Sequence, residues 1–233
     1  MKTKPYRSIP IRECNEPLIA IPRDLFSFTS PHPYVAIGAP YGSTSPWMLR
    51  KSVLESLIAA QTKLSQQRPG WKIKLFDALR PNEVQAFMFA RAMQEIAVKS
   101  GLSLDIISDE KREEIKTAAS EFWGIPSEDP ATPPPHSTGA AIDCTLCDEN
   151  GNEVEMGSPI DELSERSLPD YFAGACDEIG KAAHANRSFL CQIMETEGFT
   201  RLPQEWWHFS KGDQVAAWIT GRDFAVYGRA AHL

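Results

Sequence analysis

Hydrophobic residues follow two different periods in the first half of the chain. Between residues 45 and 67 they recur every three or four positions, which predicts a helix. Ser45 and Pro46 suit the N-cap and the first position of this helix. Over residues 71–75 apolar residues alternate with lysines, which predicts a strand with one solvent-facing side. Residues 1–44 show neither period, and we expect an extended N-terminal arm packed on the core.

The second half repeats both patterns without a regular alternation of strand and helix. We expect helices over 81–100, 108–123, 174–197 and 213–219, and strands over 139–146 and 205–210. This mixture favours an α+β fold over a doubly wound parallel sheet. No stretch has the composition of a linker, so we expect residues 1–233 to form a single domain.

Composition and charge exclude several classes of protein. The 233 residues are 42% hydrophobic, which is too much for a disordered chain. Lys and Arg number 24 against 31 Asp and Glu, and the scattered basic residues argue against a nucleic-acid partner. The absence of a long apolar run argues against a membrane span and a secretory signal. Five irregularly spaced cysteines do not form a disulfide framework, so we expect a reducing cytoplasm.

Two short segments carry residues that could share a metal ion. His136 is followed by Asp143 at the start of one predicted strand, and Glu205 is followed by His208 on another. A catalytic zinc ion takes three protein ligands, and a spare carboxylate could then accept a proton from water. The spacing does not decide which acid is the ligand and which is the base. Glu205 and His208 would face opposite sides of an ideal strand, so bending or the longer reach of Glu205 must bring them together.

Three blocks of sequence, in this order, resemble the VanX-like D-alanyl-D-alanine dipeptidases, a family of zinc peptidases. They are Phe76-Asp77-Ala78-Leu79-Arg80-Pro81, the segment from His136 to Leu146, and Glu205-Trp206-Trp207-His208. Met156 to Asp161 and the predicted helix from Asn186 to Gly198 are also similar to segments of this family. The resemblance covers residues 45–212. It implies a small antiparallel sheet flanked by helices, the D,D-peptidase or hedgehog-like zinc peptidase fold.

The resemblance also implies an activity and its metal ligands. The expected reaction is zinc-dependent hydrolysis of D-Ala-D-Ala or a similar small dipeptide of D-amino acids. This dipeptide substrate is the partner that we expect, while the oligomeric state stays open. His136, Asp143 and His208 match the zinc ligands, which implies one Zn²⁺ per chain. Glu205 matches the catalytic base, and Arg80 matches the arginine that stabilises the transition state.

Substrate contacts are assigned in the same way. Asp161 matches the acid that receives the free amino group of the substrate. Trp206 and Trp207 alternate along the predicted strand, so one should pack in the core while the other lines the pocket, and we assign the pocket to Trp206. Two positions depart from the family pattern: Pro134 replaces a serine, and Phe209 stands where tyrosine is common. The first 44 residues do not align convincingly with the family's N-terminal segment.

Other functions fit fewer of these residues. A D,D- or L,D-carboxypeptidase or endopeptidase acting on muropeptides would use the same zinc site, but the missing signal sequence and Asp161 argue against it. A zinc-stabilised binding module would need no base such as Glu205. A non-haem iron oxygenase commonly has one residue between its His and its carboxylate, where this chain has six. Cys144 and Cys147 are expected to be buried small residues, and His32, His184 and His232 have no partner that the sequence reveals.

Overall fold

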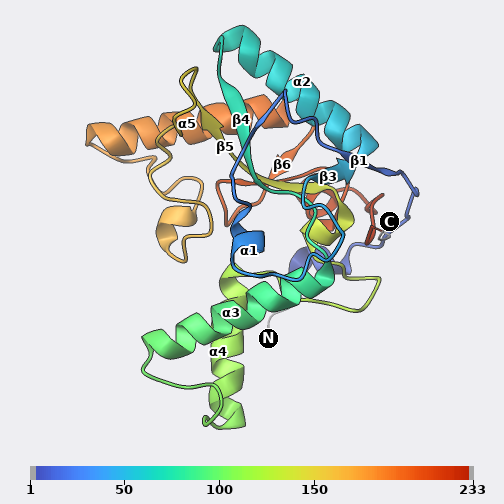
Figure 1. The fold of residues 1–233 in the computed structure, drawn as a ribbon, viewed down its shortest axis with the longest axis vertical. Helices are drawn as coiled ribbons and strands as arrows, with labels where there is room; N and C mark the ends of the chain where they lie inside the picture. The colour runs from blue at the N-terminus through green and yellow to red at the C-terminus, as the bar shows by residue number, and fades with distance from the viewer. Residues whose placement is uncertain (1–3, 231–233) are drawn as a thin grey trace.

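A five-stranded sheet forms the centre of the computed structural model, which describes residues 4–230 (Figure 1). Its strands, in spatial order, are β2 (Ser27–Phe28), β4 (Lys72–Asp77), β5 (Ala141–Cys147), β7 (His208–Ser210) and β6 (Thr200–Arg201). The β2–β4 pair is parallel, and the other three pairs are antiparallel. A second, two-stranded sheet pairs β1 (Leu18–Ala20) with β3 (Met48–Arg50).

Two groups of helices lie at opposite ends of the molecule (Figure 1). The longer helices are α2 (Lys51–Gln67) and α5 (Glu178–Glu195), which contact each other, and α3 (Asn82–Lys99) and α4 (Asp109–Phe122), which form a hairpin. The short ones are α1 (Pro33–Ala36), α6 (Gln214–Ile219) and the 3₁₀ turns η1 (Pro5–Ser8), η2 (Pro135–Thr138) and η3 (Glu165–Ser167).

The core divides in the same way. The larger apolar cluster joins the inner face of the sheet to α2 and α5, with Leu57, Leu75, Ile142 and Leu190 fully buried. A smaller cluster packs α3 against α4. The strand β5 is buried along its whole length, which explains why all of its residues except Asp143 and Thr145 are apolar. This α+β fold agrees with the prediction from the sequence, apart from the one parallel pair of strands.

Three predicted elements need correction. The helix expected from Ser45 begins at Lys51, because residues 48–50 pair with β1 and Ser45 Oγ instead accepts a hydrogen bond from Trp47 N at 3.2 Å. The strand expected over 205–210 begins only at His208, since residues 203–204 and 206–207 form turns. The N-terminal arm packs on the core as expected, but it also contains two strands and a short helix.

All five cysteines are free, and Cys144 and Cys147 are buried in β5 as expected. Over residues 4–230, no helix combines the length and hydrophobicity that crossing a membrane requires. His232 lies outside the described residues.

Candidate active site: a His-Asp-His cluster in a small cavity

Register across the sheet aligns three polar residues on neighbouring strands. Asp143 on β5 is the direct partner of His208 on β7 and of Asp77 on β4. The β4–β5 register shifts between Leu75 and Asp77, and this bulge brings Asp77 opposite Asp143. Directly opposed residues point to the same face of a sheet, so the fold places all three side chains together.

His136 reaches the same place from the 3₁₀ turn that precedes β5. Pro135 begins this turn, and Gly139 ends it with a φ of 70°, a conformation that favours glycine. A Cβ atom at Gly139 would also collide with Leu18. His136 Nδ1 lies 2.8 Å from the carbonyl oxygen of Ala78, to which it donates, so its Nε2 faces the cluster as an acceptor.

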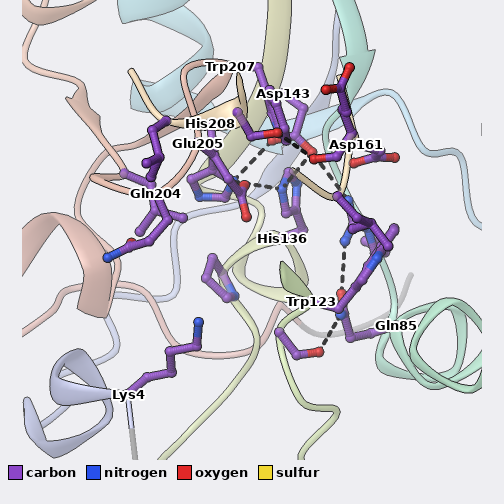
Figure 2. A pocket seen from close by; sticks show the side chains of 18 of the residues that line it. Lys4, Gln85, Trp123, His136, Asp143, Asp161, Gln204, Glu205, Trp207 and His208 are labelled. Carbon is purple, nitrogen blue, oxygen red and sulfur yellow. Dashed lines mark hydrogen bonds and ion pairs between the residues drawn. The ribbon is translucent and has the colours of Figure 1, made fainter. Parts of the chain in front are cut away.

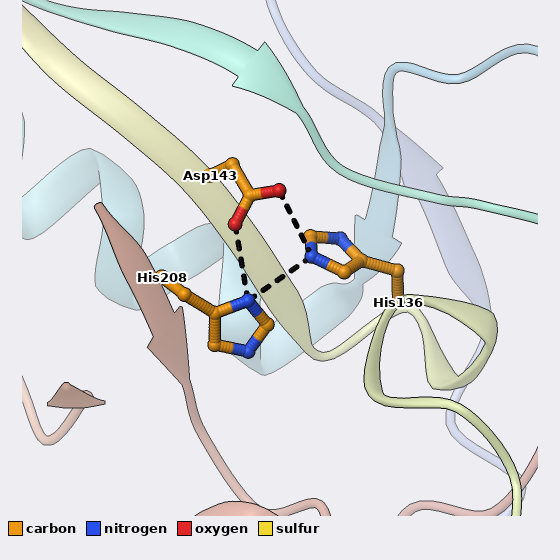
Figure 3. A group of neighbouring side chains, drawn as sticks. All are labelled: His136, Asp143 and His208. Carbon is orange, nitrogen blue, oxygen red and sulfur yellow. Dashed lines mark hydrogen bonds and ion pairs between the residues drawn. The ribbon is translucent and has the colours of Figure 1, made fainter. Parts of the chain in front are cut away.

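The arrangement of His136, Asp143 and His208 fits a tetrahedral metal ion (Figure 3). His136 Nε2 and His208 Nδ1 are 3.2 Å apart; His136 Nε2 lies 3.1 Å from Oδ2 of Asp143, and His208 Nδ1 lies 3.0 Å from its Oδ1. Ligand atoms around zinc at about 2.0–2.1 Å would be separated by roughly 3.3 Å, the edge of the tetrahedron. The predicted ligands are therefore brought together at metal-ligand spacing.

The surrounding hydrogen bonds also suit a cation. His208 Nε2 lies 3.2 Å from Ser210 Oγ, which in turn donates to Asp213 Oδ2 at 2.9 Å. This leaves the Nδ1 lone pair of His208 facing the cluster. Although burial opposes it, the carboxylate of Asp143 raises the pKa of His208 above its usual value, so the cluster attracts positive charge. The imidazoles in turn hold the pKa of Asp143 well below its usual range despite burial.

Glu205 enters the cluster from a turn rather than from a strand. Its Oε2 lies 3.8 Å from His208 Nδ1, and its side chain is 21% exposed, so it borders both the cluster and the solvent. On an ideal strand Glu205 and His208 would face opposite sides. Because Glu205 lies in a turn instead, both side chains can reach the same site. Burial raises the pKa of Glu205 above its usual value. A carboxyl group with a raised pKa can both accept and return a proton.

Arg80 lies beside the cluster, directly after β4. Its Nε donates to Asp77 Oδ2 at 2.8 Å, and one terminal nitrogen donates to Gln85 at 3.0 Å. The other terminal nitrogen lies 3.3 Å from Asp143 Oδ2. Although burial disfavours its charge, the acidic groups around it hold the pKa of Arg80 well above its usual value. The guanidinium group is therefore fixed and permanently charged.

Asp161 completes the group of predicted residues from a separate loop. Tyr34 OH donates to Asp161 Oδ2 at 2.7 Å and accepts from Arg80 at 3.1 Å, so one hydroxyl links the two charged residues. Asp161 is half-buried and adopts a φ of 65°, which is uncommon for a residue other than glycine. Burial, followed by the charge of Asp143, raises the pKa of Asp161 to about 7.

A cavity of about 240 Å³ is lined by the side chains of this site, namely Arg80, His136, Asp143, Asp161, Glu205 and His208 (Figure 2). Its volume is below the roughly 300–1,000 Å³ of pockets for drug-sized ligands, so it suits a small substrate. Trp207 lines this cavity. Trp206, which we expected there, is 1% exposed and turns away to donate to Ser158 Oγ at 3.0 Å. The position of Trp206 does not support a substrate contact.

Sequence reasoning missed several residues that support the cluster. His32 Nε2 donates to Asp77 Oδ1 at 3.0 Å, and Tyr34 lies two residues further along the arm. Nothing local in the sequence marks either residue, because their partners are more than 40 residues away. Lys4 and Tyr6 of the arm also line the cavity. Asp77 could have been found, since it stands three residues before Arg80 in the block that carries the resemblance.

Comparison with known proteins assigns the family. The family described as D-ala-D-ala dipeptidase, among the M15 peptidases, matches residues 27–226. This chain belongs to the D-Ala-D-Ala dipeptidase family. It is 44% identical to the D-alanyl-D-alanine dipeptidase of Synechocystis, over 97% of this chain and 96% of that protein. The Escherichia coli D-alanyl-D-alanine dipeptidase is 45% identical over 32% of this chain and 36% of its own length.

Membership makes the chain a metallopeptidase of the dipeptidase type. The match begins at residue 27, so it includes the segment around Tyr34 that we expected to fall outside the resemblance. Two solved structures are more distant: the LdcB LD-carboxypeptidase, with a TM-score of 0.48 and 16% identity, and the vancomycin resistance D,D-pentapeptidase VanY in complex with Zn(II), with 0.44 and 14%. The match to LdcB covers 93% of this chain and 78% of LdcB, and the match to VanY covers 76% of this chain and 81% of VanY.

Proposed function

We propose that the protein hydrolyses the peptide bond of D-Ala-D-Ala, or of a similar small dipeptide of D-amino acids, with one zinc ion held by His136, Asp143 and His208. The observation that carries this proposal is the convergence of three metal-ligating side chains, whose ligand atoms lie within 4.8 Å of one another, in a small cavity that also contains a carboxylate and a fixed guanidinium group. A zinc ion bound there would supply the positive charge that polarises the scissile carbonyl and activates a water molecule.

Glu205 is the general base in this proposal. Its carboxylate takes a proton from the attacking water as the new carbon–oxygen bond forms. It then gives that proton to the amide nitrogen as the carbon–nitrogen bond breaks, which releases the second residue as a free amine. Its position beside His208, and its partial exposure to the cavity, support this role for the carboxylate.

Arg80 and Asp161 orient the dipeptide and stabilise the charge that develops. Arg80 faces the negative charge on the carbonyl oxygen, and because Asp77 and Gln85 already hold it, little reorganisation is needed. Asp161 receives the substrate ammonium group. A carboxylate at this position favours substrates whose free amino group lies one residue from the scissile bond, which is the defining feature of a dipeptide.

The test is release of free D-alanine from D-Ala-D-Ala by the zinc-loaded protein, with L-Ala-L-Ala as the control substrate. We expect release from the D,D-dipeptide alone, and a loss of about 10³-fold in kcat in Glu205→Ala with one equivalent of zinc still bound. Glu55→Ala, on the exposed surface of α2, is the matched control and should retain activity. No release of D-alanine by fully zinc-loaded protein would contradict the proposal and direct attention to muropeptides.

A further inference from the structure

One wall of the cavity is formed by a long loop with little regular structure of its own. Residues 156–168 connect the hairpin after β5 to the segment before α5, and only η3 within them is regular. Asp161 and several residues that follow it line the cavity. The positive φ of Asp161 is a conformation that residues other than glycine adopt infrequently. Contacts elsewhere must therefore hold this loop in place.

Arg187 on α5 provides these contacts at both ends of the loop. The side chain is completely buried. Its Nε donates to the carbonyl oxygen of Met156 at 2.6 Å, and its NH1 donates to that of Leu168 at 2.8 Å. Its NH2 donates to the carbonyl oxygen of Arg166 at 2.9 Å and to Ser158 Oγ at 3.0 Å. One guanidinium group thus joins the first and last residues of the loop.

Two aromatic rings lie close to this guanidinium group. Its central carbon lies 4.9 Å from the ring centre of Phe172 and 5.1 Å from that of Trp206. Burial lowers the pKa of Arg187 to about 10, so the residue remains charged at neutral pH. A planar charged group with several donors in fixed directions can bind several carbonyl oxygens at once, which a lysine cannot do.

Ser158 extends the contacts from the loop to the turn that carries Glu205. Its hydroxyl accepts from Arg187 and from Trp206 Nε1, which lies at 3.0 Å. The main-chain nitrogen of Trp206 also donates to the carbonyl oxygen of Ser167 at 3.0 Å. The residue directly after Glu205 is therefore bonded to the loop that carries Asp161.

We propose that Arg187 is a positioning residue for substrate recognition: together with Ser158 it holds the loop so that Asp161 faces the cavity, and so determines how tightly the free amino group of the dipeptide is bound. Arg187 does not line the cavity and does not touch the substrate in this proposal. The proposal rests on the proposed role of Asp161 as the acceptor of the ammonium group.

The first test compares Arg187→Met, Arg187→Lys and Ser158→Ala with the wild-type enzyme in steady-state hydrolysis of D-Ala-D-Ala. We expect KM to rise about tenfold or more in Arg187→Met, less in Arg187→Lys, and about threefold in Ser158→Ala, while kcat per bound zinc stays within about threefold. Arg112→Lys, which removes a guanidinium bond to the carbonyl oxygen of Leu104 in the α3–α4 hairpin, is the matched control with unchanged KM.

A purely structural role predicts a different pattern. It would lower the melting temperature and the fraction of active protein while KM remains unchanged. Ser158→Ala keeps the measurement possible if both Arg187 variants fail to fold, because it removes one hydroxyl and no charge. An unchanged KM in Ser158→Ala and in every folded Arg187 variant would overturn the proposal.

A double-mutant cycle separates this proposal from the proposed role of Asp161. Asp161→Asn alone should raise KM, and Ser158→Ala should add little to it, because both changes act on the same contact. Fully additive effects on KM would overturn the proposal and leave Asp161 in its role. An unchanged KM in Asp161→Asn would overturn the proposed role of Asp161 and this inference with it.

Discussion

The two walls of the cavity are held in place by different means. One wall is part of the sheet, where the register of β5 and β7 places Asp143 opposite His208. The other wall is the loop of residues 156–168, where side-chain bonds from Arg187 and Tyr34 fix the position of Asp161. Backbone pairing fixes the first wall, whereas the second depends on a few long side chains. Changes to the first should therefore affect chemistry, and changes to the second should affect substrate affinity.

Two carboxyl groups of the cavity show the same contrast. Neighbouring imidazoles hold the pKa of Asp143 well below its usual range, although burial opposes this. Burial and the nearby charge of Asp143 raise the pKa of Asp161 to about 7. The sheet wall therefore favours a permanent anion that can bind a metal ion, while the loop wall carries an acid that a substrate ammonium group can ionise.

Removal of a predicted metal ligand should have the largest effect. His208→Ala removes one of three ligand atoms and leaves the carboxylate of Asp143 without one of its partners. We expect zinc content well below one equivalent and loss of measurable turnover. Metal analysis after dialysis, together with D-alanine release, tests this. Full zinc occupancy in the variant would remove His208 from the ligand set.

The next largest effect should follow a change at Arg80. Arg80→Lys keeps a positive charge but loses the fork that binds Asp77 and Gln85 together. We expect kcat to fall about 10²–10³-fold with KM changed much less, because the charge develops only in the transition state. A variant that raises KM and retains kcat would instead place Arg80 on the side of substrate binding.

Tyr34→Phe should weaken the loop wall, and it should therefore affect substrate binding more than chemistry. It removes the hydroxyl that donates to Asp161 and accepts from Arg80. A hydrogen bond to a charged group contributes about 1.5–3 kcal/mol, so we expect KM for the dipeptide to rise about tenfold. Measured kcat should fall less than in Arg80→Lys. An equal fall of kcat in both variants would mean that the two walls do not act separately.

The smallest effect concerns stability. The raised pKa of Asp161 means that, between about pH 4 and pH 7, the unfolded chain has lost a proton that the folded chain keeps. Stability therefore falls as the pH rises through this window, and Asp161→Asn should remove that loss. We expect the metal-free variant to exceed the metal-free wild type by about 1–2 kcal/mol at pH 8.5, since the side chain is partly exposed.

Urea unfolding of both metal-free proteins at pH 4.5 and pH 8.5 measures this difference. Tyr34 OH can still donate to the amide oxygen of the variant, so the loop contact is retained. At pH 4.5 the two proteins should have closely similar stability. A larger advantage of Asp161→Asn at pH 4.5 than at pH 8.5 would contradict the pKa shift.

The sequence predicted the sheet wall better than the loop wall, for a physical reason. Strand periodicity and short motifs are local, so β4, β5 and the residues His136, Asp143 and His208 could be located before the structure was known. The positions of Glu205 and Trp206 were expected from a strand, but the chain forms a turn there, and the two side chains diverge. Periodicity cannot reveal a turn whose bonds reach back to Ser167.

Long-range pairing explains the other differences. The cap signal at Ser45 is local, yet β3 forms because Leu49 pairs with Ile19 across about 30 residues. His32 and Tyr34 belong to an arm without periodicity, and each acquires its role from a partner elsewhere in the chain. Local patterns cannot reveal such pairs.

The most direct test of the two-wall account compares D-Ala-D-Ala with its N-acetyl derivative as substrates of the zinc-loaded enzyme. Acetylation removes the ammonium group that Asp161 is proposed to receive and leaves the scissile bond unchanged. A charge-assisted hydrogen bond of about 1.5–3 kcal/mol predicts that kcat/KM is at least about tenfold higher for the free dipeptide. The difference should lie mainly in KM and should disappear in Asp161→Asn. Equal kcat/KM for the two substrates in the wild-type enzyme would contradict the account.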